Sequence, residues 1–141
     1  MLENAWAESP ADTASPWESP ALGDPPIDLV HLARQCQGDP GLEDELLGLF
    51  RGLAGSLAAQ ISDPRTGLEL KAGAAHKLRG AALAVGARQV ACAAGTIEDM
   101  ARAATASGDP NSDRTRASLA ITALQATVTA AVAQIDRLRG R

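Results

Sequence analysis

The chain has 141 residues, enough for one domain with its own core, and its formal net charge is −4. It holds 30 alanines and only three aromatic residues, which favours helices over strands and predicts an all-α protein. No apolar run approaches the roughly 18 residues of a membrane span, no secretion signal is apparent, and aromatic residues are too few for base stacking. We therefore expect a cytoplasmic protein that binds neither membranes nor nucleic acids, with Cys36 and Cys92 as free, buried thiols.

Residues 1–26 contain five of the eight prolines and five acidic residues, with no lysine or arginine. Such a segment buries too little apolar surface to offset its ordering entropy, so we predict a disordered acidic tail. The remaining domain, 27–141, holds 13 basic and 12 acidic residues and is nearly neutral. Within the tail, Trp6-Ala7-Glu8-Ser9-Pro10 is loosely repeated as Trp17-Glu18-Ser19-Pro20. The repeat is either a docking motif, for a partner or for the domain itself, or an accident of low-complexity sequence.

Helical periodicity begins directly after the tail. A short helix is predicted from about Asp28, a plausible N-cap, to Cys36. Four long helices follow over about 40–61, 67–85, 87–106 and 113–138. Because short connections favour antiparallel neighbours, we predict an antiparallel four-helix bundle with a short additional N-terminal helix. The expected core residues, spaced three or four apart, are Leu42, Leu46, Leu47, Leu49, Phe50, Leu53, Leu57 and Ile61, then Leu68, Ala72, Ala75, Leu78, Ala82 and Val85, then Val90, Ala94, Ile97 and Ala101, and finally Ile121, Leu124, Val128, Ala131, Ile135 and Leu138.

His76 has unusual neighbours within the second long helix. The positions that would cover its imidazole, three and four residues away, are Ala72, Gly73, Arg79 and Gly80. Each glycine costs a helix interior about 1 kcal/mol relative to alanine. We interpret the small residues as leaving the imidazole exposed and giving another protein's backbone room to approach.

An exposed imidazole is a nucleophile near neutral pH, because its ordinary pKa is about 6.5. One of its nitrogens can accept a phosphoryl group and release it, and the guanidinium of Arg79 can bind the phosphoryl oxygens. The sequence shows no glycine-rich phosphate loop, catalytic triad or carboxylate cluster for a metal. We therefore expect a carrier that relies on its partners for catalysis, and we expect the other histidine, His31, to be structural.

Residues 75–87 resemble the signature of histidine-containing phosphotransfer (HPt) domains of bacterial multistep phosphorelays. The matching residues are Ala75-His76-Lys77-Leu78-Arg79-Gly80, followed after five positions by Gly86-Ala87. Less specific similarities are Ile27-Asp28, Gly38-Asp39-Pro40, the leucine-rich helix with Phe50, and Ile97-Glu98. The resemblance implies a helical bundle that accepts a phosphoryl group on His76 from an aspartate of one receiver domain and passes it to another.

The resemblance also implies roles and partners. Arg79, in place of the usual lysine, would stabilise the phosphoryl group, and Gly80 would allow the close approach of the receiver. Expected partners are response-regulator receiver domains, which bring the magnesium ion, and a hybrid or other histidine kinase. The carrier itself would be a monomer without a cofactor and without kinase or phosphatase activity of its own. We expect further receiver contacts from a basic, small-residue surface with an apolar rim, made of Lys71, Gly73, Lys77, Leu83 and Arg88.

Three alternatives remain open. The chain can be a non-phosphorylated helical adaptor that binds a response regulator or a kinase, although the presence of His76 speaks against it. It can be the phosphoacceptor module of a chemotaxis-type kinase, although its extent favours a free-standing carrier. A kinase dimerisation-and-phosphoacceptor helix fits less well, because Lys77 stands where that helix has an acidic residue. Glu98, Asp99 and Arg102 are expected to form a solvated helix face with a local ion pair.

Overall fold

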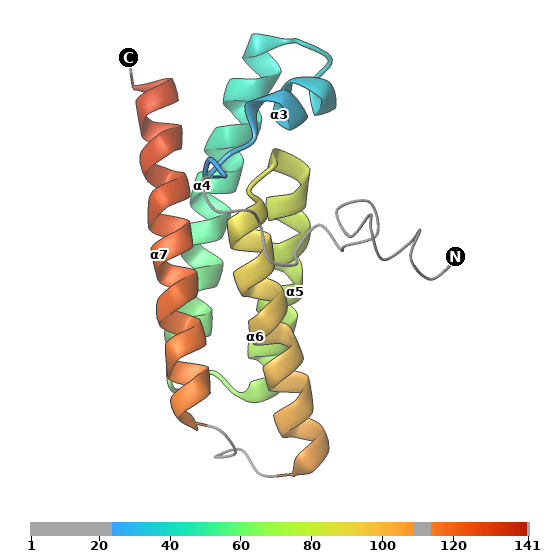
Figure 1. Cartoon of the computed structure of the whole chain (residues 1–141), viewed down its shortest axis with the longest axis vertical. Helices are drawn as coiled ribbons and strands as arrows, with labels where there is room; N and C mark the ends of the chain where they lie inside the picture. The colour runs from blue at the N-terminus through green and yellow to red at the C-terminus, as the bar shows by residue number, and fades with distance from the viewer. Residues whose placement is uncertain (1–23, 109–113, 141) are drawn as a thin grey trace, which may run out of the picture.

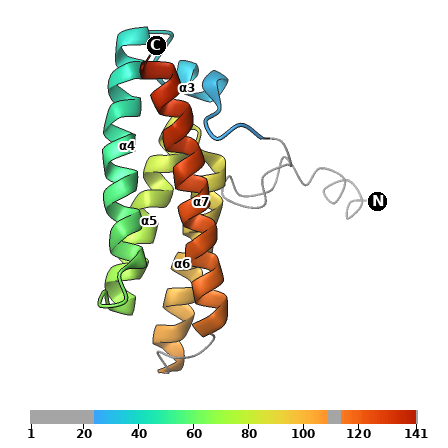
Figure 2. The same ribbon diagram turned by 90° about the vertical axis from the view of Figure 1, so that its left-hand side faces the viewer.

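The computed structural model describes residues 24–108 and 114–140, and their helices are α3 (Leu29–Gln35), α4 (Pro40–Ser62), α5 (Leu68–Val85), α6 (Arg88–Ser107) and α7 (Arg114–Arg139). The four long helices run up and down side by side, and α3 lies near the end at which α4 begins (Figure 1). Helices α4 and α6 each pack against both α5 and α7, so the bundle closes on itself (Figure 2). The described residues contain no strand. The predicted all-α four-helix bundle with a short additional N-terminal helix is confirmed.

Aspartates set the starts of the first two helices. The carboxylate of Asp28 accepts hydrogen bonds from the amides of Val30 and His31, both at 3.1 Å, and caps α3 as predicted. Asp39 caps α4 in the same way, and Pro40 occupies the first turn, where its missing amide proton costs nothing. The observed bounds of all five helices lie within two residues of the predicted ones.

Helix α5 ends at Gly86, where the chain turns sharply into α6. Gly86 adopts the left-handed conformation with φ of 80°, and a Cβ there would lie 2.9 Å from the backbone oxygen of Asp28. The amide of Asp28 donates to the Gly86 carbonyl at 2.9 Å, which ties the start of α3 to this turn. Both the backbone conformation and the close approach therefore require glycine.

Replacing Gly86 with alanine should lower the free energy of unfolding by about 1–3 kcal/mol, through the left-handed backbone and the contact with Asp28. The matched control is Gly52→Ala in the exposed middle of α4, where a Cβ would meet nothing within 4 Å. That change should raise stability by about 0.5–1 kcal/mol, because alanine is the better helix former. Urea denaturation followed by circular dichroism measures both values. Equal stability of the Gly86 variant and the native protein would contradict this account of the turn.

The first half of α4 differs from the predicted core. Leu42, Leu49 and Leu53 were expected to be buried, but they are exposed, whereas Leu47 and Phe50 lie in the core. Two apolar stripes with helical spacing overlap on this helix, and spacing alone does not say which one faces the other helices. In the other long helices the predicted residues are buried, except Leu68, Ile121 and Leu138, which are half-buried. Cys36 is buried, which raises the pKa of its thiol, and Cys92, expected to be buried, is half-buried.

Helix α7 has the length and the composition of a membrane span, with a mean hydropathy of 1.4 over its most apolar 18 residues. Its sequence contains no long continuous apolar run, because Ser118, Thr122 and Gln125 interrupt it. Its fully or largely buried residues, such as Leu124 and Ile135, belong to the core of the bundle. Only 22% of the apolar window is buried, so the packing of the bundle accounts for the buried face of this helix alone.

The predicted tail meets the domain at residues 24–26. Asp24 lies against the first turn of α6, with its carboxylate 3.3 Å from Arg88 and its carbonyl accepting a hydrogen bond from Gln89 at 2.9 Å. Three residues later, the side chain of Ile27 is fully buried. The prediction for residues 1–23 lies outside the described part of the chain.

Candidate functional site

His76 lies in the middle of α5, and its side chain is 61% exposed. Gly73 and Gly80, one turn away on either side, are exposed, and a Cβ built on either would meet nothing within 4 Å. The open surroundings predicted for the imidazole are confirmed. A large surface can therefore approach this histidine without displacing any side chain at these two positions.

Small residues bring α6 close to α5 at the level of His76. Ala72, Ala75 and Ala82 of α5 are buried, and so are Ala94 and Gly95 of α6. The separation of packed helices decreases with the size of the side chains between them. This close packing lets a side chain of ordinary length on α6 reach the imidazole on α5.

That side chain is Glu98, whose carboxylate is only 7% exposed. Its Oε2 lies 3.0 Å from Nδ1 of His76 and also accepts hydrogen bonds from Nε and Nη2 of Arg102, at 3.1 and 2.9 Å. Its Oε1 lies 2.9 Å from Nη1 of Arg79. One buried carboxylate thus contacts the histidine and two arginines.

The charge of Glu98 follows from these contacts. Burial raises the pKa of a carboxyl group, but the hydrogen bond from Arg102, the positive charge of Arg79 and the contact with His76 outweigh it. The pKa of Glu98 is therefore lowered from its ordinary value of 4.5, and the group is ionised at neutral pH. These ion pairs keep Glu98 ionised, although burial alone would favour its neutral, protonated form.

An ionised carboxylate only accepts hydrogen bonds, so the contact with Glu98 requires a proton on Nδ1 of His76. In the neutral imidazole the other nitrogen, Nε2, then carries the lone pair. The guanidinium of Arg79 also lies near Nδ1, with Nη2 at 3.3 Å, but it is paired through Nη1 with Oε1 of Glu98 at 2.9 Å, which leaves Nδ1 to the nearer and negatively charged carboxylate. The arrangement selects one tautomer and makes Nε2 the nucleophilic atom.

The other residues predicted for the site fall into two groups. Lys77 is exposed on α5 next to His76, and Leu83 is half-buried two turns further along. Lys71 and Arg88, by contrast, have other roles: Lys71 donates to the carbonyls of Ile61 and Asp63 at 2.6 and 2.9 Å. It therefore closes the turn between α4 and α5. Burial lowers the pKa of its ammonium, and the negative charge of Asp63 opposes this shift.

Arg88 contacts Asp24, and it is ten residues from Glu98 along α6, or about 15 Å. The expectation that Lys71 and Arg88 contribute to the basic surface at His76 is corrected accordingly. Near the imidazole, the positive charges of Arg79, Arg102 and Lys77 exceed the single charge of Glu98. The local surface is basic, and Arg102 of α6 contributes to its positive charge.

Glu98 and Arg102 were expected to form a solvated helix face, and this interpretation was wrong for Glu98. A signal was present in the sequence: Glu98 follows Ala94 by four residues and precedes Ala101 by three, and both alanines were predicted core positions. An acidic residue on the same side of a helix as its buried alanines needs a charged or hydrogen-bonding partner on the helix that packs against that side. His76 and Arg79 on α5 are those partners.

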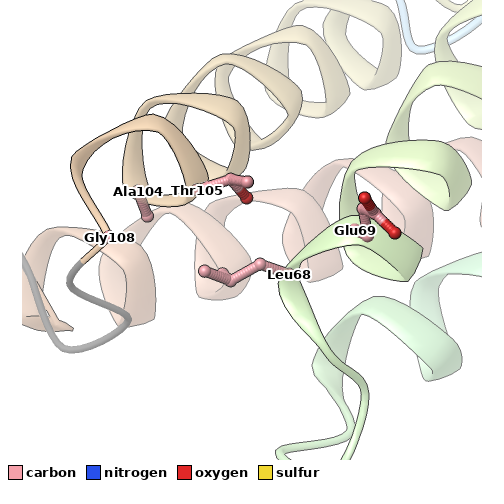
Figure 3. A pocket seen from close by; sticks show the side chains of 5 residues that line it. All are labelled: Leu68, Glu69, Ala104, Thr105 and Gly108. Atoms are coloured by element: carbon pink, nitrogen blue, oxygen red, sulfur yellow. The ribbon is translucent and has the colours of Figure 1, made fainter.

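A separate pocket of about 370 Å³ lies between the start of α5 and the end of α6 (Figure 3). It is lined by Leu68, Glu69, Ala104, Thr105 and Gly108. Glu69 precedes His76 by seven residues, about 10 Å along α5. The imidazole of His76 lies outside this pocket, on an exposed part of the surface.

No protein-family profile and no curated protein sequence matches the chain. Among solved structures, it is similar to the crystal structure of a rice protein described as a candidate histidine-containing phosphotransfer protein. The two superpose with a TM-score of 0.58 over 97% of this chain and 90% of the rice protein, at 14% sequence identity. The chain has the HPt fold. The HPt fold thus accommodates a sequence that shares few residues with the rice protein.

Proposed function

We propose that this protein is a phosphocarrier of a multistep phosphorelay in two-component signal transduction. His76 would accept a phosphoryl group from an aspartate of one receiver domain and pass it to an aspartate of another. The observation that carries this proposal is the exposed imidazole whose Nδ1 is held by the buried carboxylate of Glu98. The HPt fold and the resemblance of residues 75–87 to the HPt signature support it.

The proposed transfer uses Nε2 of His76 as the nucleophile. Its lone pair forms the new N–P bond while the O–P bond of the aspartyl phosphate breaks, and the aspartate leaves as a carboxylate. The imidazole becomes cationic as the bond forms, and the negative charge of Glu98 beside Nδ1 stabilises that cation. Transfer to the second receiver is the reverse reaction, with a free aspartate as the nucleophile.

Positive side chains would balance the charge of the phosphoryl group. Arg102 is 60% exposed and Lys77 is exposed, so both can approach phosphoryl oxygens, while Arg79 is largely buried against Glu98. In this proposal Arg79 fixes the carboxylate and presents the remaining part of its guanidinium to the phosphoryl group. The receiver is expected to bring the magnesium ion, and the carrier would have neither kinase nor phosphatase activity of its own.

The test is phosphotransfer from a receiver domain labelled on its aspartate. We expect the label to move to this protein and to show the chemistry of a phosphoramidate, stable in base and labile in acid. A panel of receivers would identify the specific partners from their rates. Stable binding of a receiver without any transfer of label would refute the carrier and would favour the adaptor.

Gly80 provides a test of the close approach. Replacing it with glutamine should leave the fold intact, because a Cβ there meets nothing within 4 Å, and should reduce transfer at least about tenfold by keeping the receiver away from His76. Circular dichroism checks the fold, and the transfer rate checks the approach. Full transfer by a folded Gly80→Gln protein would show that the receiver does not need this space.

A further inference from the structure

The two oxygens of the Glu98 carboxylate are held in different ways. Oε2, which lies 3.0 Å from Nδ1 of His76, accepts hydrogen bonds from Nε and Nη2 of Arg102 at 3.1 and 2.9 Å. Oε1 is buried and lies 2.9 Å from Nη1 of Arg79, but it accepts no aligned hydrogen bond within the described part of the chain. Arg79 therefore attracts the carboxylate by its charge, whereas Arg102 also fixes the direction of Oε2.

Arg102 reaches Glu98 from the same helix. It follows Glu98 by four residues, a spacing that places both side chains on one side of α6, and the acid precedes the base, which is the favourable order. The side chain of Arg102 is 60% exposed, while that of Glu98 is only 7% exposed. The arginine can therefore be replaced at the surface without opening the core of the bundle.

The contact with Arg102 affects both the charge and the orientation of Glu98. Burial raises the pKa of this carboxyl group, and the hydrogen bond from Arg102 is the largest of the effects that lower it. A carboxyl group that becomes protonated or rotates no longer offers Nδ1 of His76 a fixed acceptor. The proton of the neutral imidazole is then free to move to Nε2, which removes the lone pair from the nitrogen proposed to react.

We propose that Arg102 is a positioning residue for the phosphotransfer: it holds Oε2 of Glu98 against Nδ1 of His76 and thereby keeps the lone pair on Nε2. The effect on transfer rests on the proposed function, whereas the effect on the imidazole stands by itself. Arg102 lies outside residues 75–87, so the resemblance to the HPt signature assigns it no role. Its bonds to Glu98 use Nε and Nη2, which is compatible with an approach of Nη1 to the phosphoryl group.

Nitrogen-15 NMR of the unphosphorylated full-length protein reads the tautomer directly, because a protonated ring nitrogen and one with a lone pair differ in chemical shift. At about pH 9, where imidazoles are neutral, we expect native His76 to carry its proton on Nδ1. In the Arg102→Gln protein the signals should show a mixture of both tautomers. The chain has only two histidines, so a His31→Gln variant assigns the signals. An unchanged tautomer in the Arg102→Gln protein would overturn the positioning role.

Transfer of label from a receiver tests whether Arg102 acts through Glu98. Arg102→Gln should slow transfer at saturating receiver by about tenfold, as expected for losing a group that orients a functional histidine. In a Glu98→Gln protein the same change should slow transfer by less than about threefold more, because residues that act through one contact are not additive. Reductions that multiply in full would overturn the role and assign Arg102 to the phosphoryl group itself.

Arg65 offers a matched control. It also binds a carboxylate through Nε and Nη2, at 3.1 and 3.0 Å from the oxygens of Asp63, but in the connection between α4 and α5. Arg65→Gln should change neither the tautomer of His76 nor the transfer rate. Equal changes in the two glutamine variants would overturn the specific role of Arg102, since they would reflect only the loss of a positive charge.

A lysine at position 102 separates charge from geometry. Arg102→Lys keeps the positive charge but not the planar fork, so it should recover part of the transfer rate and of the native tautomer. A lysine variant no better than the glutamine variant in both measurements would overturn the electrostatic hold on Glu98. If the native protein accepts no label from any receiver, the proposed function fails, while the NMR signals still decide whether Arg102 positions the imidazole.

Discussion

Replacing His76 with glutamine should reduce phosphotransfer to background, because no other described side chain combines an exposed imidazole with a fixed tautomer. Glutamine is similar in size and polarity but has no nucleophilic ring nitrogen. The side chain at position 76 is mostly exposed, so the free energy of unfolding should change by less than about 0.5 kcal/mol. The measurements are transfer of label from a phosphorylated receiver and chemical denaturation of the same preparation.

The other histidine offers a matched control. His31 lies in α3, where its backbone amide is part of the cap made by Asp28. The same substitution, His31→Gln, should leave the transfer rate unchanged. Label retained by the His76 variant, or lost in the His31 variant, would show that the phosphoryl acceptor has been misassigned.

Replacing Glu98 with glutamine should slow transfer by about 10- to 100-fold, the cost typical of losing the carboxylate that orients a functional histidine. The amide group of glutamine can donate to Nδ1 as well as accept from it, so it no longer selects the tautomer with the lone pair on Nε2. It also lacks the negative charge that stabilises the cationic imidazole during transfer. The transfer rate at saturating receiver separates this effect from weaker binding.

The same variant should change how stability depends on pH. Because the pKa of Glu98 is lowered in the folded protein, its ionised form stabilises the fold above the ordinary value of 4.5. That stabilisation is lost as the pH falls below 4.5 and through the lowered pKa of the folded state. The Glu98→Gln protein should be less stable than the native protein by about 1–3 kcal/mol at pH 7, and the difference should shrink in acid.

Asp99 is the matched control for Glu98, because it is the next residue on α6 and is exposed. Asp99→Asn should change neither the transfer rate nor the dependence of stability on pH. Denaturation of the three proteins from pH 7 down through the ordinary value of 4.5 and into stronger acid follows the loss of this stabilisation as Glu98 becomes protonated. Parallel curves for the native and Glu98→Gln proteins would contradict the role of the buried carboxylate.

Much of the fold could be predicted because its signals are local. The cap residues Asp28 and Asp39, the proline at position 40 and the regular spacing of apolar residues define where helices begin, end and face. These signals failed where two stripes competed on α4, since Leu49 and Phe50 both belong to plausible helical patterns and only contact with other helices separates them. Local periodicity thus determines that a helix forms more reliably than which side it buries.

In the candidate site, too, some features follow from neighbouring residues of one helix and others from contacts between helices. The exposure of His76 follows from the small residues one turn away, which lie on its own helix and are visible in the sequence. Its partner Glu98 is 22 residues away on another helix, and the contact exists because small side chains let α5 and α6 pack closely. Lys71 and Arg88 are close to His76 in sequence, yet they are engaged with backbone carbonyls and with Asp24 instead.

By itself, the sequence determined the helical class, the helix boundaries and the exposed histidine, because each depends on residues within one or two turns of a helix. Only the tertiary structure decided which carboxylate holds the imidazole, which nitrogen carries the lone pair and which cations surround it. The reason is that hydrogen bonds and ion pairs act over a few ångströms. They therefore depend on how close two helices come, and that distance is set by the packing of many side chains together.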